Sequence, residues 1–319
     1  MPSATTPVSV LIAGEINLDL ILHDYSAFPS LGREVIVDEC LMTLGSASAI
    51  TAVGLSRLGI PVRFVGKIGQ DSWGDQCLKE MRAAGVDTSL VSRAQEAQTG
   101  ITVSVSSSDD RALVTFPGAI AELRVDEIPD EAWKDVGHLH ISSYYLQRGL
   151  QPAIPNLFRL ARERNMTISL DPGGDPAGQW QNGVREAIAL VDLFFPNEVE
   201  LEGIATGSSA VENLTDLEAL AERVNVIAKL GPLGCLTVAK EGVESVPAPT
   251  VNVVDPTGAG DSFNAGFLAA WLRGRKLVDC MRDGVCCGAL ATRGLGGTVT
   301  QPNERELHSF RLTHFPDAP

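Results

Sequence analysis

Two kinds of hydrophobic pattern divide the chain. Solid apolar runs that alternate with helical segments are typical of buried parallel strands. They lie at 8–13, 138–142, 168–170, 191–195, 225–230 and 251–254. Apolar and polar residues instead alternate, with differing regularity, at 34–41, 99–105 and 111–116, as in strands with one wet face. We therefore predict one α/β domain over 1–319, a doubly wound, mostly parallel sheet flanked by helices, with a small antiparallel β lid from discontinuous segments at about 33–43 and 99–118.

Composition and charge narrow the possible functions. With 319 residues, of which 44% are hydrophobic, the chain can bury a large core. Its net charge of −15 argues against nucleic acid or an anionic membrane as a partner. No apolar run is long enough to span a bilayer, and residues 1–7 lack the pattern of a secretory signal. The six cysteines form no C-x-x-C pair, so we expect reduced, buried thiols in a cytoplasmic protein.

The C-terminal third contains a strand, turn and helix pattern that suits an anion. The predicted strand 251–254 is followed by a turn of small residues and then by a helix with Phe263, Phe267 and Trp271 on one face. Gly274 is placed to end that helix. Backbone N–H groups in the small-residue turn can point at a phosphate, which the helix dipole also favours.

An aspartate lies at the opening of this predicted anion site. Bound phosphate would repel Asp261, so its presence calls for a reason. A kinase supplies one, because Asp261 can take the proton from an attacking hydroxyl while Gly258, Ala259 and Gly260 stabilise the transferred phosphoryl group. The alternative is that Asp261 is a helix N-cap. The three small residues before it, and Asp255, favour catalysis.

The segment 255–263, DPTGAGDSF, resembles the C-terminal signature of the ribokinase-like (PfkB) carbohydrate kinases. No G-x-x-x-x-G-K-[ST] sequence occurs, which excludes a P-loop, and Phe263 stands where a Rossmann turn has its third glycine. The resemblance implies an ATP-dependent sugar kinase that uses ATP and Mg²⁺. It also implies a monovalent cation such as K⁺, a sugar as the small-molecule substrate, and a homodimer formed through the lid.

Other matches to the family imply the substrate site. Asp19, after the first strand, matches an aspartate that binds substrate hydroxyls, and Asn17 can assist it; the alternative is that Asp19 caps a turn. Residues 45–52, GSASAITA, resemble the segment G-G-S-x-x-N-x-A, which brings Gly45 and Ser46 to the sugar. Ile50 replaces the sugar-binding asparagine, and this departure argues against ribose itself. Asp171 ends a predicted parallel strand, where substrate or metal would bind.

The nucleotide and metal residues follow from the same resemblance. An N-x-x-E motif at 197–200 is linked in the family to Mg²⁺ and phosphate through water; the alternative is a helix start rich in acidic groups. A K-x-G-x-x-G turn begins at Lys229, and the segments 286–298 flank the adenine and supply carbonyls to the monovalent cation. The implied residues are Asn197, Lys229, Gly231, Gly234, Thr257 and Ala289 for the nucleotide, and Glu200 and Asp255 for metal.

Two other functions remain open. One is a kinase for a nucleoside such as adenosine, because the apolar Ile50 would suit a base. The other is a catalytically silent sugar- or nucleotide-binding protein, against which the intact Asp261 argues. His138 and His140 lie two residues apart on a predicted core strand and can in principle bind a metal; with no third ligand near in sequence, a structural role is favoured.

Overall fold

The computed structural model describes residues 8–25, 28, 30–106, 111–239 and 242–316. At its centre is a seven-stranded sheet in the order β11-β10-β9-β8-β1-β4-β5, with every neighbouring pair parallel. This arrangement confirms the predicted doubly wound α/β fold. The strands are β1 (Val10–Ala13), β4 (Val62–Ile68), β5 (Asp87–Arg93), β8 (His138–Ile141), β9 (Thr167–Leu170), β10 (Leu193–Phe194) and β11 (Asn225–Val226).

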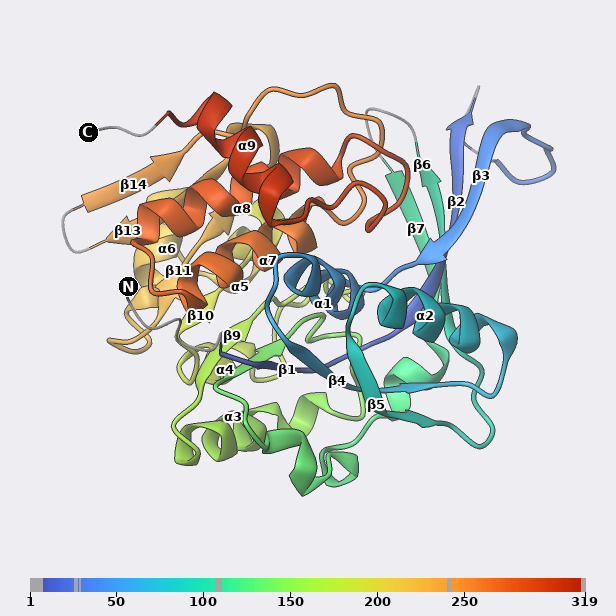
Figure 1. The fold of residues 1–319 in the computed structure, drawn as a ribbon, viewed down its shortest axis with the longest axis horizontal. Coiled ribbons are helices and arrows are strands. Elements are labelled where there is room, and N and C mark those ends of the chain that lie inside the picture. Colours follow the sequence, from blue (N-terminus) through green and yellow to red (C-terminus); the bar gives the residue numbers. More distant parts are fainter. Residues whose placement is uncertain (1–7, 26–27, 29, 107–110, 240–241, 317–319) are drawn as a thin grey trace.

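Helices cover both faces of this sheet because its strands are apolar on both faces. In β1, Val10 and Ile12 belong to a core shared with α1, α2, α7 and α8, whereas Leu11 and Ala13 belong to a second core with α3 to α6 (Figure 1). The helices are α1 (Ala47–Arg57), α2 (Ser72–Ala83), α3 (Ile154–Glu163), α4 (Val184–Ile188), α5 (Glu198–Ile204), α6 (Ala210–Glu218), α7 (Ala259–Leu272), α8 (Leu277–Ala291) and α9 (Glu304–His314).

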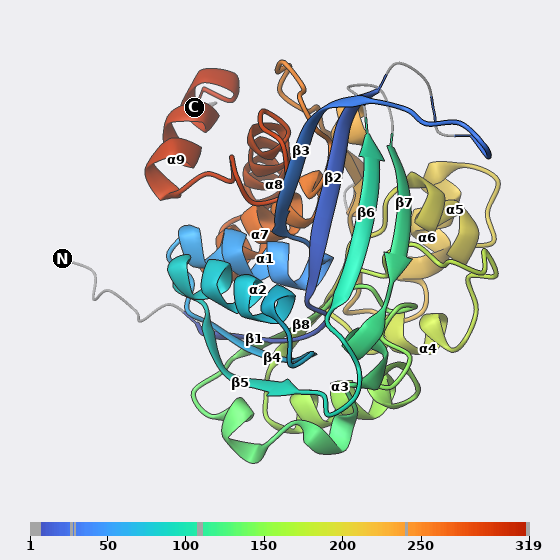
Figure 2. The ribbon, with the colours of Figure 1, turned by 90° about the vertical axis from the view of Figure 1, so that its right-hand side faces the viewer.

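A four-stranded sheet, here called the lid sheet, stands upright beside the parallel sheet (Figure 2). It has the order β3-β2-β6-β7, formed by β2 (Asn17–Tyr25), β3 (Val37–Leu44), β6 (Gly100–Ser106) and β7 (Arg111–Phe116). The outer pairs are antiparallel, while β2 and β6 run parallel. The segments predicted for the lid supply three of these strands. The fourth, β2, was not anticipated, because apolar residues on both of its faces hide the alternation.

A third, antiparallel sheet contains β12 (Ala228–Lys229), β13 (Cys235–Ala239) and β14 (Gly242–Val246). The strand predicted at 225–230 is therefore divided, with its first half in the parallel sheet and its second half here. The prediction of a strand at 251–254 is wrong. Among the described residues no strand pairs with it; instead the N–H groups of Val254 and Asp255 both donate to the carbonyl of Thr292, at 2.8 and 3.2 Å.

Within the described ranges, no helix is both long enough and apolar enough to cross a membrane. All six cysteines are free thiols. Five are buried as predicted, and burial raises the pKa of Cys235 and of Cys280 to about 12. Cys40, on β3, is exposed, and for this residue the prediction of burial is wrong.

Candidate active site

The strand order reverses between β1 and β8. From β1 the chain adds β4 and β5 on one side, and from β8 it adds β9, β10 and β11 on the other. Open α/β sheets bind ligands in the crevice outside the carboxyl ends of the strands at such a point. Glu15, Asp171 and Asn197 follow β1, β9 and β10 at this edge, so the crevice is lined with polar groups.

Asp171 and Lys229 form a buried ion pair at this edge. Nζ of Lys229 lies 2.5 Å from Oδ2 of Asp171, which also accepts a hydrogen bond of 2.6 Å from Nδ2 of Asn264. Burial acts to raise the pKa of Asp171, but Lys229 and Asn264 outweigh it and hold that pKa below its usual value. Burial acts to lower the pKa of Lys229, but Asp171 and Glu200 raise it. Both groups are therefore charged. Asp171, which was predicted to bind the substrate, is thus paired with Lys229, which was predicted to bind the nucleotide.

Asn197 and Glu200 cap the start of α5. Oδ1 of Asn197 accepts from the Glu200 N–H at 2.9 Å, and Oε2 of Glu200 accepts from the Asn197 N–H at 2.8 Å. This is the helix start that we considered as the alternative to a metal role. Glu200 is also electrostatically strained, because burial and then the charge of Asp171 raise its pKa to about 7. A second carboxylate nearby raises a pKa because it disfavours the charged form.

The turn at 258–260, here called the anion turn, leads into α7. Gly258 is the N-cap with a φ of 74°, and Asp261 is the third residue of the helix, so Asp261 is not the cap. The Ala259 N–H donates to the carbonyl of Pro256 at 3.3 Å. In the part of the chain that the structure describes, no backbone carbonyl accepts a hydrogen bond from the N–H groups of Gly258 and Gly260. Backbone carbonyls therefore do not compete with an anion for two of the three predicted donors.

Asp261 and Lys229 meet at the anion turn. A Cβ placed on Gly260 would lie 3.4 Å from Nζ of Lys229. After burial and Asp171, the charge of Asp261 also contributes to the raised pKa of Glu200. Helix α1 holds the turn from the other side, where Oγ1 of Thr51 donates to the carbonyl of Asp261 at 3.3 Å. An ammonium group and a carboxylate thus both lie at the anion turn.

Asn17, Asp19 and Gly45 lie together at the base of the lid sheet. Nδ2 of Asn17 donates to Oδ1 of Asp19 at 2.8 Å and to Oγ1 of Thr102 at 3.1 Å. A Cβ on Gly45 would lie 2.0 Å from Oδ1 of Asp19, so only glycine fits there. Ser46 has a different place: its Oγ donates to the carbonyl of Glu15 at 2.5 Å and caps α1.

Glu15 and Ile50 also lie near this site. Glu15 was not among the predicted site residues, and the structure shows what Ile50 packs against. Glu15 is buried, and its carboxylate accepts hydrogen bonds from the N–H and Oγ of Ser48, at 3.0 and 2.5 Å. Its position directly after the first strand is the signal that would have found it. Ile50 is also buried, and Cδ1 of Ile50 would lie 2.5 Å from a Cβ on Gly297. Gly297 in turn packs against Gly258, so Ile50 places an apolar wall behind the anion turn.

A cavity of about 470 Å³, here called the α7 cavity, lies beside the anion turn. It is lined by four residues predicted for the nucleotide, Lys229, Gly231, Gly234 and Ala289. Thr257 is buried beneath the turn and does not line it. The lining that was missed comes largely from the segment wrongly predicted as a strand and from α7 and α8. These residues are Pro232, Ala248, Pro249, Thr250, Val251, Val253, Pro256, Phe263 and Val285. Ala259 and Gly260 of the anion turn, and Gly288 and Thr292 of the predicted segment 286–298, also line the cavity.

Asp255 lies behind the anion turn and ties it to the loop before α9. Its Oδ1 accepts from the Thr257 N–H and its Oδ2 from the Gly296 N–H, both at 2.9 Å. The described residues contain no group of three or more His, Cys, Asp or Glu side chains placed to hold a metal ion. The two predicted metal residues, Glu200 and Asp255, are therefore not joined in one ligand set.

Comparisons with known proteins cover nearly the whole chain. The family model described as pfkB family carbohydrate kinase matches residues 8–304. An "Uncharacterized sugar kinase" of Archaeoglobus fulgidus is 31% identical over 238 residues, 73% of this chain and 91% of its own. An ATP-dependent ribose-1-phosphate kinase of Halopiger xanaduensis is 28% identical over 309 residues, 97% and 99% of the two chains. The solved structure of Arabidopsis thaliana ribokinase complexed with ribose and ATP has a TM-score of 0.79 at 21% identity, covering 96% of this chain and 99% of its own.

Proposed function

Because the chain belongs to the pfkB family of carbohydrate kinases, as its sequence signature predicted, we propose that it transfers the γ-phosphoryl group of ATP to a hydroxyl group of a sugar. The observation that carries the proposal is that Lys229 and Gly260 line the α7 cavity together, with Asp261 next to Gly260 in the chain and near enough to act on the pKa of Lys229. Phosphoryl transfer needs positioning and charge stabilisation more than covalent chemistry. A carboxylate, an ammonium group and backbone N–H donors at one place supply both.

Asp261 acts as the general base in this mechanism. It accepts the proton of the attacking hydroxyl as the oxygen approaches the phosphorus atom in line with the leaving group. The N–H groups of Gly258 and Gly260 and the ammonium group of Lys229 stabilise the negative charge on the transferred phosphoryl oxygens. Asp171 keeps Lys229 in position and charged, since their pairing raises the pKa of the lysine against the effect of burial.

The acceptor binds between the lid sheet and the carboxyl end of β1. Asp19 accepts hydrogen bonds from two hydroxyl groups of the sugar, a geometry that suits a polyol. Asn17 orients Asp19 and is itself oriented by Thr102, whose hydroxyl lies 3.1 Å from that of Thr115 on β7. Asn17 and Asp19 lie on β2 and the two threonines on β6 and β7, so three strands of the lid sheet contribute to the sugar site.

ATP occupies the α7 cavity, whose size suits a small-molecule ligand. Burial and then the charge of Asp171 raise the pKa of Glu200, and a bound Mg²⁺ would offset both effects; Glu200 and Asn197 would hold it through water. When bound, Mg²⁺ neutralises charge that develops on the phosphates. Asp255 is buried, and no Lys, Arg or His within the described chain pairs with it, which fits K⁺ held with nearby carbonyls.

The lid sheet has an outer face that favours a homodimer. Met42, Val114 and Phe116 are 45%, 68% and 50% exposed, and the register places Leu20 and Val103 between them. A contiguous apolar face of this kind marks an association surface. Val114→Lys should convert a dimer into a monomer in sedimentation velocity, and a wild-type monomer at micromolar concentration would contradict the proposal.

A nucleoside is the second candidate acceptor, and Ile50 is the observation that favours it. The side chain that replaces the family asparagine is apolar, buried and packed behind the anion turn. Such a wall can contact a base but cannot donate to a sugar hydroxyl. ADP release measured against a panel of sugars and nucleosides separates the two candidates.

Asp261→Asn tests the proposed chemistry. Loss of the general base should lower turnover with the best acceptor by roughly 10²–10⁴ while ATP still binds. Asp126→Asn, a change of the same kind at an exposed residue, serves as the control. If Asp261→Asn turns over as fast as the wild type, the base is elsewhere. If no acceptor raises ADP release above the level of Asp261→Asn, the chain is a silent binding protein.

A further inference from the structure

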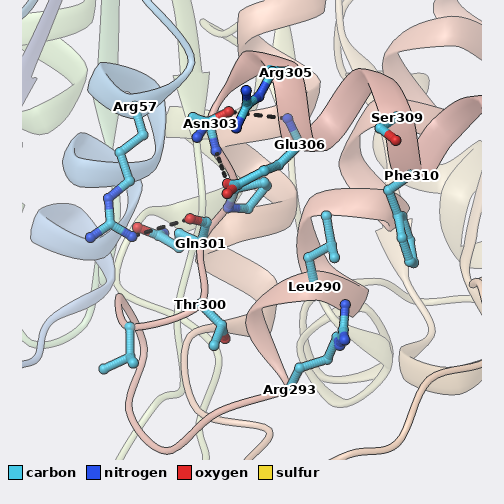
Figure 3. A pocket seen from close by; sticks show the side chains of 12 residues that line it. Arg57, Leu290, Arg293, Thr300, Gln301, Asn303, Arg305, Glu306, Ser309 and Phe310 are labelled. Carbon is cyan, nitrogen blue, oxygen red and sulfur yellow. Dashed lines mark hydrogen bonds between the residues drawn. The ribbon is translucent and has the colours of Figure 1, made fainter.

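A second cavity, of about 960 Å³, lies between α1, the end of α8 and the first turns of α9 (Figure 3). We call it the α9 cavity. It shares no lining residue with the α7 cavity, and none of the predicted site residues lines it. The proposed function therefore leaves it without a role.

The α9 cavity is lined by positive charge. Arg57, Arg293 and Arg305 contribute three guanidinium groups, against one carboxylate from Glu306. That carboxylate is engaged in capping α9, where Oε2 of Glu306 accepts from the Asn303 N–H at 3.0 Å. No acidic side chain of the described residues lies within ion-pair distance of Arg293 or Arg305. Such a concentration of unpaired arginines stands out in a chain whose net charge is −15.

The same cavity has an apolar side. Leu290 and Phe310 lie together on one wall, across from Arg57 and Gln301 (Figure 3), and Val299 and Pro302 add to the apolar lining. Its volume is at the upper end of the range for small-molecule sites, so an inorganic anion would fill only a part. Arginine binds phosphate through paired N–H donors. The lining therefore suits a ligand with a phosphate group and an organic body.

We propose that the α9 cavity binds an organic phosphate, either a nucleoside phosphate or a sugar phosphate, as an effector of the enzyme. Arg293, beside Leu290, binds the phosphate group, and Arg305, at the other end of the cavity beside Asn303 (Figure 3), adds to the positive charge of the lining. Leu290 and Phe310 contact the organic part. The binding half of this inference does not depend on the proposed acceptor or on the catalytic role of Asp261.

Hydrogen bonds around Gln301 connect the α9 cavity to the active site. Nε2 of Gln301 donates to Oγ of Ser262 at 2.9 Å and to the carbonyl of Ile50 at 3.0 Å. Ser262 is the residue after Asp261. Nη1 of Arg57 donates to the carbonyl groups of Thr298 and Gln301, which holds the same loop. A ligand that contacts Arg57 or Gln301 thus acts on the loop that packs against the anion turn.

Binding is tested by calorimetry with the α7 cavity saturated by a non-hydrolysable ATP analogue. The probes are AMP, ribose 5-phosphate and inorganic phosphate, each at constant ionic strength. We expect AMP or ribose 5-phosphate to bind once per chain, and the better of the two identifies the class. Inorganic phosphate binding as tightly as both would overturn the assignment to an organic phosphate, and so would the absence of binding by all three.

The variants locate the site. Arg293→Ala/Arg305→Ala should weaken binding by roughly tenfold or more, because a charge-assisted contact and a second positive charge of the lining are lost. Arg293→Lys/Arg305→Lys, which keeps the charge, should recover part of the affinity. Arg124→Ala/Arg148→Ala makes the same change in net charge at two exposed arginines outside the cavity and should leave affinity unchanged. Equal affinity in the wild type and Arg293→Ala/Arg305→Ala would place the bound probe elsewhere.

A kinetic measurement tests the proposed role of the ligand as an effector. The probe that binds should change KM or kcat of the wild type and should have no effect on Arg293→Ala/Arg305→Ala, whose turnover without the probe stays at the wild-type level. Binding without any kinetic change would leave a site with no regulatory role and overturn this half. If the chain shows no turnover at all, the proposed function fails while the calorimetric result stands.

Discussion

Lys229 and Asp171 form the most buried ion pair of the described chain, with side chains that are 12% and 5% exposed and a separation of 2.5 Å. They end two different strands, β12 and β9, which belong to different sheets. The pair fixes an ammonium group beside Gly260. It therefore connects the packing of the two sheets to the charge at the anion turn.

Removal of one member of this pair should destabilise the protein strongly. Lys229→Met leaves the carboxylate of Asp171 buried without its cation, which costs about 3–5 kcal/mol in comparable cases. Urea unfolding monitored by circular dichroism measures the free energy of unfolding. Turnover should also fall, because the anion turn loses its ammonium group.

The double variant Lys229→Met/Asp171→Asn is the control for that experiment. It removes both charges, so it should be more stable than Lys229→Met alone, although turnover stays low. Equal unfolding free energies for the single and the double variant would mean that the pair carries no coupling energy.

Glu200 should make stability fall as pH rises. Its pKa is raised from the model-peptide value of 4.5 to about 7 by burial and by Asp171. Between these two values the folded chain holds a proton that the unfolded chain has lost, so the free energy of unfolding decreases from about pH 4.5 to about pH 7. Glu200→Gln cannot titrate and should remove this part of the decrease in urea unfolding across that range.

Glu218 provides the comparison, because burial raises its pKa to about 7 as well. On α6 it accepts a hydrogen bond from the Val226 N–H at 3.3 Å, and it does not line the α7 cavity. Glu218→Gln should change the pH dependence of stability in the same direction while turnover keeps its pH profile. Glu200→Gln should alter both. A pH profile of turnover that moves equally in the two variants would argue against a role for Glu200 at the phosphates.

The sequence predicted five of the seven parallel strands because these are apolar runs, but β4 and β5 were not among the predicted runs. It predicted the family because 255–263 is a long ungapped signature. Strands with one solvent-exposed face were harder to predict from the sequence. In β2, Asn17, Asp19 and Ile21 face one way and Leu20 faces the other, so the alternation of polar and apolar positions is incomplete. The segment 251–254 has strand composition but no partner strand, and pairing is a tertiary property that local pattern does not report.

For the candidate site, the sequence proposed residues but not the contacts between them. Asn17, Asp19 and Gly45 lie together as the resemblance implies, yet nothing local links Asp171 to Lys229, which are 58 residues apart. Ion pairs between strand ends depend on the order of strands in the sheets. The three arginines of the α9 cavity were likewise invisible, because they come from α1, from the loop after α8 and from α9.

Gly258 should tolerate no side chain. Its φ is 74°, and a Cβ would lie 2.6 Å from Cα of Gly297, which is backbone and cannot rotate away. Gly258→Ala therefore adds a backbone clash to the cost of about 1–2 kcal/mol for a left-handed residue. We expect a large loss of turnover together with a larger loss of stability than the conformation alone explains, measured by ADP release and urea unfolding.

Gly274, at the end of α7, is the matched control. Its φ is 70°, and nothing lies within 4 Å of the position of its Cβ. Gly274→Ala should therefore show the conformational cost by itself, about 1–2 kcal/mol, with turnover unchanged. If the two variants lose the same stability and both stay active, the contact between Gly258 and Gly297 is unimportant for the anion turn.

His138 and His140 belong to a chain of hydrogen bonds through the centre of the parallel sheet. Oγ1 of Thr167 donates to the carbonyl of Gly137 at 3.3 Å, so it accepts from Nδ1 of His138. Ser169 then joins the two rings, at 2.8 Å from Nε2 of His138 and 2.7 Å from Nδ1 of His140. These contacts support the structural role that was favoured from the sequence, and they assign the Nδ1 proton to each neutral ring.

The two histidines should make stability rise with pH, in the opposite direction to Glu200. Burial lowers the pKa of His138 from 6.5 to about 3 and that of His140 to about 4. The unfolded chain gains protons below about pH 6.5 that the folded chain excludes, so the free energy of unfolding falls as the pH is lowered from about 6.5 to about 4. Urea unfolding at several pH values in this window should show a smaller fall for His140→Gln than for the wild type. His308→Gln, at an exposed residue of α9, serves as the control. A fall of the same size in His140→Gln and the wild type would mean that the buried ring is already charged.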